Sequence, residues 1–191
     1  MSSIEIKNRI KITDQKWLNL FEVSYEAKGK EGKWIYASRK ENPTNELSAD
    51  AIIIAPIIKI KNEYKLVLIK EFRIPLGKYE IGFPAGLAEK KETAENCAER
   101  ELFEETGLKI TSIFSVSPLL ISSAGLSDEA VVMVFCECEG TVSSDYLETT
   151  EDIEVLLIGQ NDIDDLLASS CCFSAKAWPF IQMFKILGKM I

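Results

Sequence analysis

The chain has 191 residues, 47% hydrophobic and 27% charged, and its 30 acidic and 22 basic residues give a net charge of −8. This is the composition of one globular domain with its own core, and the acidic charge excludes a nucleic-acid binder that relies on surplus Lys and Arg. The chain has no histidine, which excludes Ser-His-Asp and Cys-His hydrolases and zinc sites with imidazole ligands. Any chemistry must use carboxylates, Lys, Tyr, Cys or a metal bound through oxygen.

The number of cysteines and the N-terminal sequence indicate a reducing compartment. The chain has no stretch of about 18 uninterrupted apolar residues, which a membrane-spanning helix requires. The start, MSSIEIKNRIKITD, lacks the apolar centre of a signal peptide. Five cysteines are an odd number, so we expect a cytoplasmic protein with free thiols. Cys136 and Cys138 alternate in an apolar run and are expected to be buried and inert; a cysteine metal site is the alternative.

The N-terminal region reads as an arm of short strands. WLNLFEVSY (17–25) and WIYAS (34–38) flank a KGKEGK turn, which predicts a hairpin. ENPTN (41–45) has the composition of a connector. We therefore divide the chain into an N-terminal strand arm, residues 1–45, and a main domain, residues 46–191.

The main domain begins with strands and ends with helices. Two β-branched runs, 51–60 and 64–72, predict a second hairpin, and the pattern of Thr93–Thr106 predicts a helix that Gly107 ends. Strands are expected at 110–116, 130–138 and 153–158, and helices at 161–169 and 175–190. This order indicates an α+β fold rather than a doubly wound parallel sheet.

An acidic stretch of the predicted helix carries the strongest chemical signal. Glu101, Glu104 and Glu105 lie within about one helical turn, and Glu101 and Glu105 fall on its core-facing stripe. Carboxylates gathered near a core repel one another unless a cation compensates them, and oxygen ligands favour Mg²⁺ or Mn²⁺. Arg100 could hold one carboxylate in a bidentate pair. The alternative is a solvated Glu-rich helix with i, i+4 ion pairs.

The spacing of this segment resembles the signature of the Nudix hydrolase family. That signature is G, five residues, E, seven residues, R-E, an aliphatic residue, one residue, E-E, one residue, G and an aliphatic residue. Positions 86, 92, 100–102, 104, 105, 107 and 108 all match it. The resemblance implies a Nudix-type α/β/α sandwich with a mixed sheet, and metal-dependent cleavage of a nucleoside diphosphate linked to another moiety.

The resemblance also implies a metal site. Glu101 and Glu105 are the implied direct ligands of Mg²⁺, with Mn²⁺ as a substitute. Glu104 is implied as a further ligand, directly or through water, and the carbonyl of Ala85 joins the set. Gly86 would form the turn that brings this carbonyl in.

The same resemblance assigns catalytic and supporting roles. Arg100 would orient a glutamate and Glu92 would brace the loop. The water-activating base of the subfamily comes from an acidic loop, here DYLETTEDIE (145–154), and Glu151 best matches its position. Asp152 and Glu154 are substitutes, and an ordinary solvated loop is the alternative.

The substrate side resembles ADP-ribose and nucleotide-sugar pyrophosphatases. The segment that leads into the signature is similar to the corresponding segment of those enzymes; here it reads KEFRIPLGKYEIGFPAGL (70–87). The similarity to the subfamily extends over residues 16–160. The similarity assigns Arg73 and Arg39 to anion contacts and Leu87 to the substrate site. Trp17 and Trp34 would clamp the nucleobase, since a base stacks on an aromatic face; both could instead be strand core residues.

Three positions depart from that pattern: Gly82, the loop AGLSDE (124–129) and Ile35, which follows Trp34. Relatives commonly carry Glu two residues before P-A-G, where this chain has Gly82. Glu80 lies close by but is expected to point to the other face of its strand. These departures leave the preferred base and sugar open.

Together, these observations predict a Mg²⁺-dependent hydrolase of nucleoside diphosphate sugars, with ADP-ribose as the leading substrate, giving AMP and ribose 5-phosphate. The subfamily resemblance implies a homodimer in which the arm completes the partner's site. The alternatives are a hydrolase of another nucleotide sugar or an oxidised nucleoside diphosphate, and a Nudix-like sensor that binds a nucleotide without cleaving it.

Overall fold

The computed structural model describes residues 4–188. They form two compact units, one of residues 4–50 with 119–131 and one of 51–118 with 132–188. The predicted arm ended at residue 45, whereas the first unit runs to Asp50 and also takes in Leu119–Val131. We call these unit 1 and unit 2.

Unit 1 is built on a three-stranded antiparallel sheet of β1 (Ile4–Lys11), β2 (Asn19–Ala27) and β3 (Lys30–Ser38). The register places Arg9, Val23 and Trp34 side by side on one face, and Ile10, Glu22 and Ile35 on the other. The short strand β9 (Leu120–Ile121) pairs with the first residues of β10 (Ala130–Glu139). The hairpin predicted over 17–38 is therefore confirmed, and β1 adds a strand that the sequence analysis did not predict.

Unit 2 contains a mixed sheet in the order β12-β6-β5-β4-β10-β8, with β11 also paired to β5 and β7 to β4. Strands β4, β5, β8, β10 and β11 coincide closely with the predicted ones, whereas β6, β7 and β12 were not predicted. The bounds are β4 (Ala51–Ile60), β5 (Glu63–Arg73), β6 (Lys78–Gly82), β7 (Ala85–Leu87), β8 (Lys109–Val116), β11 (Ile153–Gly159) and β12 (Cys172–Phe173).

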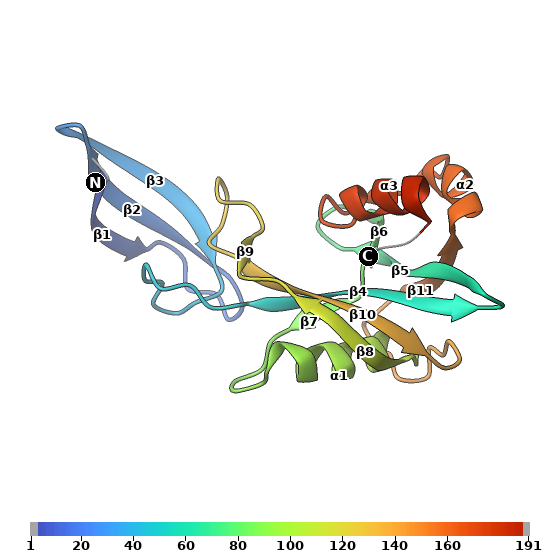
Figure 1. Ribbon diagram of the computed structural model, residues 1–191. Coiled ribbons are helices and arrows are strands. Elements are labelled where there is room, and N and C mark those ends of the chain that lie inside the picture. The colour runs from blue at the N-terminus through green and yellow to red at the C-terminus, as the bar shows by residue number, and fades with distance from the viewer. Residues whose placement is uncertain (1–3, 189–191) are drawn as a thin grey trace. The chain divides into compact units, whose positions relative to one another are not determined.

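Helices cover both faces of this sheet (Figure 1). Helix α1 (Ala94–Thr106) lies on one face, and α2 (Ile163–Leu167) and α3 (Trp178–Leu187) lie on the other. Phe180 of α3 packs against the rings of Phe83 and Phe135. The α+β sandwich with a mixed sheet and an N-terminal β arm is therefore confirmed.

The C-terminal helices are shorter than predicted. A 3₁₀ turn (Gln160–Asp162) precedes α2, and α3 begins at Trp178 with Pro179 in its first turn, where a missing N–H costs no hydrogen bond. Predicted helical residues 189 and 190 lie outside the described part of the chain. None of the described helices has the length and apolarity needed to cross a bilayer.

The five cysteines are free. Cys136 and Cys138 are buried in β10, and burial raises the pKa of each thiol to about 12. The prediction of buried, inert thiols is confirmed for this pair.

Candidate active site

Helix α1 presents the acidic residues because both of its ends are fixed by local sequence. The side chain of Thr93 accepts a hydrogen bond from the backbone N–H of Asn96, and Gly107 ends the helix with φ at 75°. The helix buries Ala98 and Leu102 against the sheet. Glu105 lies on that same inward stripe.

Glu105 is a buried carboxylate, 5% exposed. It accepts a hydrogen bond from the backbone N–H of Ala85, with 3.1 Å between N and Oε2. Burial raises the pKa of Glu105 to about 9; the Ala85 N–H opposes this rise, and the neighbouring charges of Glu101, Glu71 and Glu151 add to it. No Lys or Arg of the described chain forms an ion pair with it, so no cation offsets the burial of this carboxyl group.

Glu101 lies against Gly86. A β-carbon on Gly86 would fall 1.8 Å from Cδ and Oε1 of Glu101. The Glu101 carboxylate can therefore occupy this position only because residue 86 has no side chain. Burial raises the pKa of Glu101, and Arg100 opposes the rise. The glycine predicted to shape the loop thus also makes room for a predicted metal ligand.

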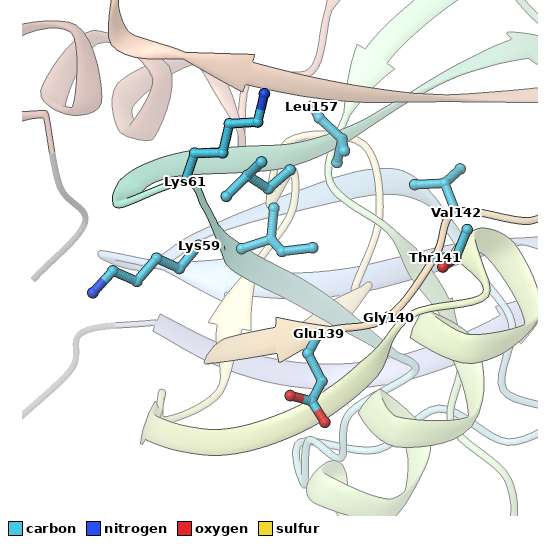
Figure 2. A pocket seen from close by; sticks show the side chains of 9 residues that line it. Lys59, Lys61, Glu139, Gly140, Thr141, Val142 and Leu157 are labelled. Carbon is cyan, nitrogen blue, oxygen red and sulfur yellow. The ribbon is translucent and has the colours of Figure 1, made fainter.

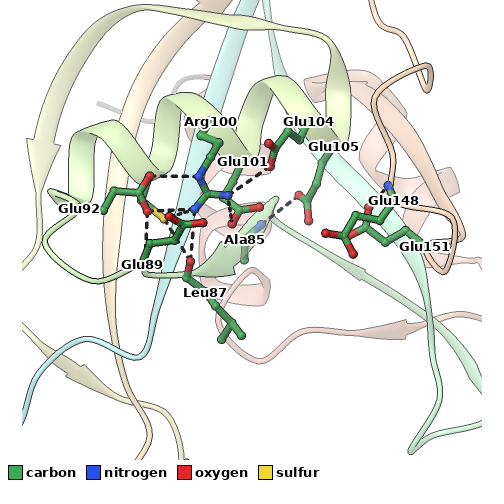
Figure 3. A network of polar contacts seen from close by, with 11 residues as sticks. Ala85, Leu87, Glu89, Glu92, Arg100, Glu101, Glu104, Glu105, Glu148 and Glu151 are labelled. Atoms are coloured by element: carbon green, nitrogen blue, oxygen red, sulfur yellow. Dashed lines mark hydrogen bonds and ion pairs between the residues drawn. The ribbon is translucent and has the colours of Figure 1, made fainter. Parts of the chain in front are cut away.

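Arg100 joins the other carboxylates of the cluster (Figure 3). Its Nη1 lies 2.6 Å from Oε1 of Glu101 and 3.2 Å from Oε2 of Glu104, and its Nη2 lies 3.0 Å from Oε2 of Glu92. The hydrogen bonds that Glu92 accepts from Arg100 and from the backbone N–H of Glu89 lower the pKa of Glu92 to about 2. The Nη2 group also donates to the carbonyl of Leu87, 3.3 Å away.

Glu151 lies across from Glu105, next to Glu148 (Figure 3). Its carboxylate accepts a hydrogen bond from the backbone N–H of Glu148, 2.9 Å away. The charge of Glu151 contributes to the raised pKa values of Glu101, Glu105 and Glu71. The structure therefore brings the predicted base to the predicted metal ligands, and its catalytic role stays a prediction.

Glu71 of β5 also belongs to this acidic cluster, although the sequence analysis did not single it out. It is half-buried, and desolvation raises its pKa. Arg73 donates to it from Nη1, 2.7 Å away, and to Glu80 from Nε, 3.1 Å away. In the sequence, Glu71 follows the buried apolar run 66–69 of β5, and no local pattern marks it as part of the site.

The predicted orientation of Glu80 is wrong. Glu80 and Gly82 are two residues apart in β6 and therefore point to the same face. Glu80 pairs across the strands with Glu71, and Gly82 pairs with Ile69. The Cβ of Ser174 lies 3.3 Å from where a β-carbon of Gly82 would be.

The donor set of the cluster fits a hard divalent cation. The candidate ligands are oxygens, and Glu105 is buried without a cation to neutralise it. Within residues 4–188, no three Cys, Asp or Glu side chains are already grouped as a metal cluster. Glu101 and Glu104 are instead paired with Arg100.

Trp17, Trp34 and Arg39 belong to unit 1. Trp17, in the bend before β2, is 69% exposed and Trp34 of β3 is 51% exposed, so neither is a core residue. Trp34 lines a groove of about 350 Å³ together with Arg9 and Tyr36. Arg39 is half-exposed, with Nε 3.8 Å from Oε1 of Glu129. Their contacts with substrate stay predictions.

A second hollow, of about 590 Å³, lies at the end of the β4–β5 hairpin (Figure 2). The side chains of Lys59, Lys61 and Glu139 project from its rim in different directions (Figure 2). It therefore lacks the converging polar groups that mark a site for chemistry. The carboxylate cluster is the candidate active site.

Comparison with known proteins agrees with this geometry. A family model for the NUDIX domain matches residues 50–168. The chain is 31% identical to the ADP-ribose pyrophosphatase of Bacillus subtilis over 158 residues, covering 80% of this chain and 84% of that protein. It is 30% identical to the ADP-sugar pyrophosphatase of Mus musculus over 159 residues, covering 80% and 72%. The crystal structure of an ADP compounds hydrolase superposes with a TM-score of 0.74 at 18% identity, over 100% and 98% of the two chains. The chain therefore belongs to the Nudix hydrolase family.

Proposed function

We propose that the protein is a Mg²⁺-dependent hydrolase of the pyrophosphate bond in nucleoside diphosphate sugars, with ADP-ribose as its leading substrate and AMP and ribose 5-phosphate as products. The observation that carries this proposal is the buried carboxylate of Glu105 beside Glu101, with the backbone of Ala85 and the acidic turn of Glu151 around it. The two relatives named for ADP-ribose and ADP-sugar hydrolysis support the choice of substrate.

Glu101, Glu105 and the carbonyl of Ala85 would hold the divalent cation, with Glu104 as a further ligand. A bound cation of this kind neutralises the diphosphate and lowers the pKa of a bound water. Arg100 must release part of its hold on Glu101 for that carboxylate to serve as a ligand, and Glu92 keeps the guanidinium in place meanwhile.

Glu151 would accept the proton of the attacking water. Its carboxylate faces the cluster and is held by a backbone N–H rather than by a lysine or arginine of the described chain. Attack on phosphorus then breaks the phosphoanhydride bond and releases two phosphate monoesters.

The substrate is proposed to be recognised by arginine and aromatic side chains. Arg73 is half-exposed beside the cluster and would bind a phosphate or the terminal sugar, next to Leu87. Trp34 and Trp17 would stack on the base, which their exposure supports. Arg39 would be a second anion contact.

We also propose a homodimer that forms through unit 1. One face of its sheet exposes Ile10, Leu20 and Ile35, each more than 40% exposed, and apolar patches of this kind mark association surfaces. The five free cysteines support action in a reducing cytoplasm.

The test is a substrate panel of ADP-ribose, GDP-mannose, UDP-glucose and 8-oxo-dGDP, each assayed with Mg²⁺, with Mn²⁺ and with EDTA. ADP-ribose should be cleaved fastest and EDTA should abolish cleavage. In Glu105→Gln, turnover should fall by about two orders of magnitude or more while the amide still accepts the Ala85 hydrogen bond. Binding of a panel member without turnover would favour the nucleotide sensor, and turnover of another member alone would reassign the substrate.

A further inference from the structure

The loop of residues 140–152, between β10 and β11, carries Glu151 but buries little of itself. None of its side chains is fully buried. Such a loop is mobile unless specific contacts hold it. The position of Glu151 therefore depends on the few contacts that tie this loop to its surroundings.

The first tie is to helix α1. The ring of Tyr146 lies on the ring of Phe103, with centroids 4.4 Å apart and planes inclined by 38°. The backbone N–H of Ser143 also donates to the carbonyl of Thr106, 3.0 Å away. Phe103 directly precedes Glu104 and Glu105, so the loop is fastened to the helix that carries the predicted metal ligands.

The second tie is at the far end of the loop. The hydroxyl of Tyr79 donates to Oδ2 of Asp152, 2.6 Å away, and the backbone N–H of Phe72 donates to the Asp152 carbonyl, 3.1 Å away. Between the two ties, the backbone N–H of Glu151 donates to the carbonyl of Glu148, 3.0 Å away, which closes a turn.

We propose that Tyr146 is a positioning residue: by packing on Phe103 it latches the 140–152 loop to α1 and holds the carboxylate of Glu151 at the carboxylate cluster. The catalytic half of this inference rests on the proposed function. Half of the Tyr146 surface is exposed, so the ring contributes little to the core. An aromatic contact of this geometry shifts a loop equilibrium by about two- to tenfold, enough to bias the loop without deciding global stability.

The test compares Tyr146→Ala, Tyr146→Phe and Phe103→Ala with a matched control, Tyr64→Ala. Tyr64 is a partly buried tyrosine of β5 whose ring contacts Lys59, far along the chain from the loop. The first measurement is amide hydrogen exchange of residues 144–151 in the protein without metal or substrate. Exchange should rise about tenfold in Tyr146→Ala and Phe103→Ala, and stay at the wild-type rate in Tyr146→Phe and Tyr64→Ala. Unchanged exchange in Tyr146→Ala would overturn the latch.

The second measurement is ADP-ribose hydrolysis with Mg²⁺. In Tyr146→Ala, kcat should fall about two- to tenfold with KM nearly unchanged, because the base rather than the binding surface is misplaced. Tyr146→Phe should restore kcat, and the double variant with Phe103→Ala should lose no more than either single variant. Faster exchange with an unchanged kcat, or additive losses, would overturn the positioning role. If the wild type does not cleave ADP-ribose, the proposed function fails, and the exchange measurement still decides the latch.

Discussion

The carboxylate of Glu101 lies so close to Gly86 that a β-carbon at position 86 would overlap it. The overlapping atoms are the far end of a flexible side chain, and the backbone of Gly86 does not have a positive φ. Gly86→Ala should therefore fold, with Glu101 rotated away. We expect turnover to fall by about a hundredfold or more with the melting temperature nearly unchanged, measured by steady-state kinetics and calorimetry.

The control for this substitution is Gly125→Ala. A β-carbon at Gly125 meets nothing within 4 Å, so both activity and stability should stay at wild-type values. Full activity in Gly86→Ala would show that the observed position of Glu101 is not needed for turnover.

The raised pKa of Glu105 predicts how stability depends on pH in the metal-free protein. The pKa rises from an ordinary 4.5 to about 9 on folding, so the folded state favours the protonated carboxyl. Its contribution is fully present below about pH 4.5 and is lost as pH rises towards 9. Denaturant unfolding in EDTA should show Glu105→Gln gaining stability relative to the wild type across that window. Parallel stability curves for the two proteins would contradict the burial of an unpaired carboxylate.

Arg100→Lys tests whether a guanidinium is required at the centre of the cluster. A lysine is a point charge and cannot serve Glu92, Glu101 and Glu104 with the fixed geometry of arginine. We expect kcat to fall by about tenfold or more and the pKa of Glu92 to rise from about 2 towards its ordinary value. An NMR titration of the side-chain carboxyls measures this, with the exposed Glu99→Gln as the control. A Glu92 pKa that stays near 2 would disprove the bridging role.

Trp34→Ala tests the base-binding assignment. The indole is half-exposed and lines the groove of unit 1, so its loss should cost little stability. KM for ADP-ribose should rise more than kcat falls, by about five- to a hundredfold for a lost stacking contact of roughly 1–3 kcal/mol. Trp178→Ala removes an indole of similar exposure from α3 and should leave KM unchanged. An unchanged KM in Trp34→Ala would remove this residue from the substrate site.

Sedimentation velocity tests the proposed dimer. The wild type should sediment as a dimer at micromolar concentration, and the double substitution Ile10→Lys with Leu20→Lys should convert it to a monomer. Both side chains point to the face of the unit 1 sheet that does not carry Trp34. Leu187→Lys, on the exposed side of α3, should leave the dimer intact. A wild-type monomer would refute the proposal.

The parts of the fold that could be predicted are those whose signals are local. Helix α1 was predicted almost to the residue because Thr93 and Gly107 mark its ends within the sequence itself. The runs of β4, β5 and β10 are buried and β-branched, which is the pattern of a central strand. The carboxylates of α1 were predicted together because helical periodicity fixes their separation.

The missed elements depend on partners distant in the sequence. β7 has three residues and exists through its pairing with β4, and β12 has two and pairs in parallel with β6. Glu71 and Glu80 meet only through the register of β5 and β6. Periodicity within one segment carries no information on register between segments, so these carboxylates could not be assigned from the sequence pattern.

Because β7 pairs with β4, the geometry of the site depends on a buried strand that contributes no side chain to the site. Ile53 opposite Ala85 and Ile52 opposite Gly86 set which way each β7 residue faces. A slip by a single residue would turn the N–H of residue 85 away from Glu105 and put a side chain where Glu101 lies. The aliphatic residues of β4 therefore fix the register of β7. Conservative substitutions among them should lower turnover before they lower stability.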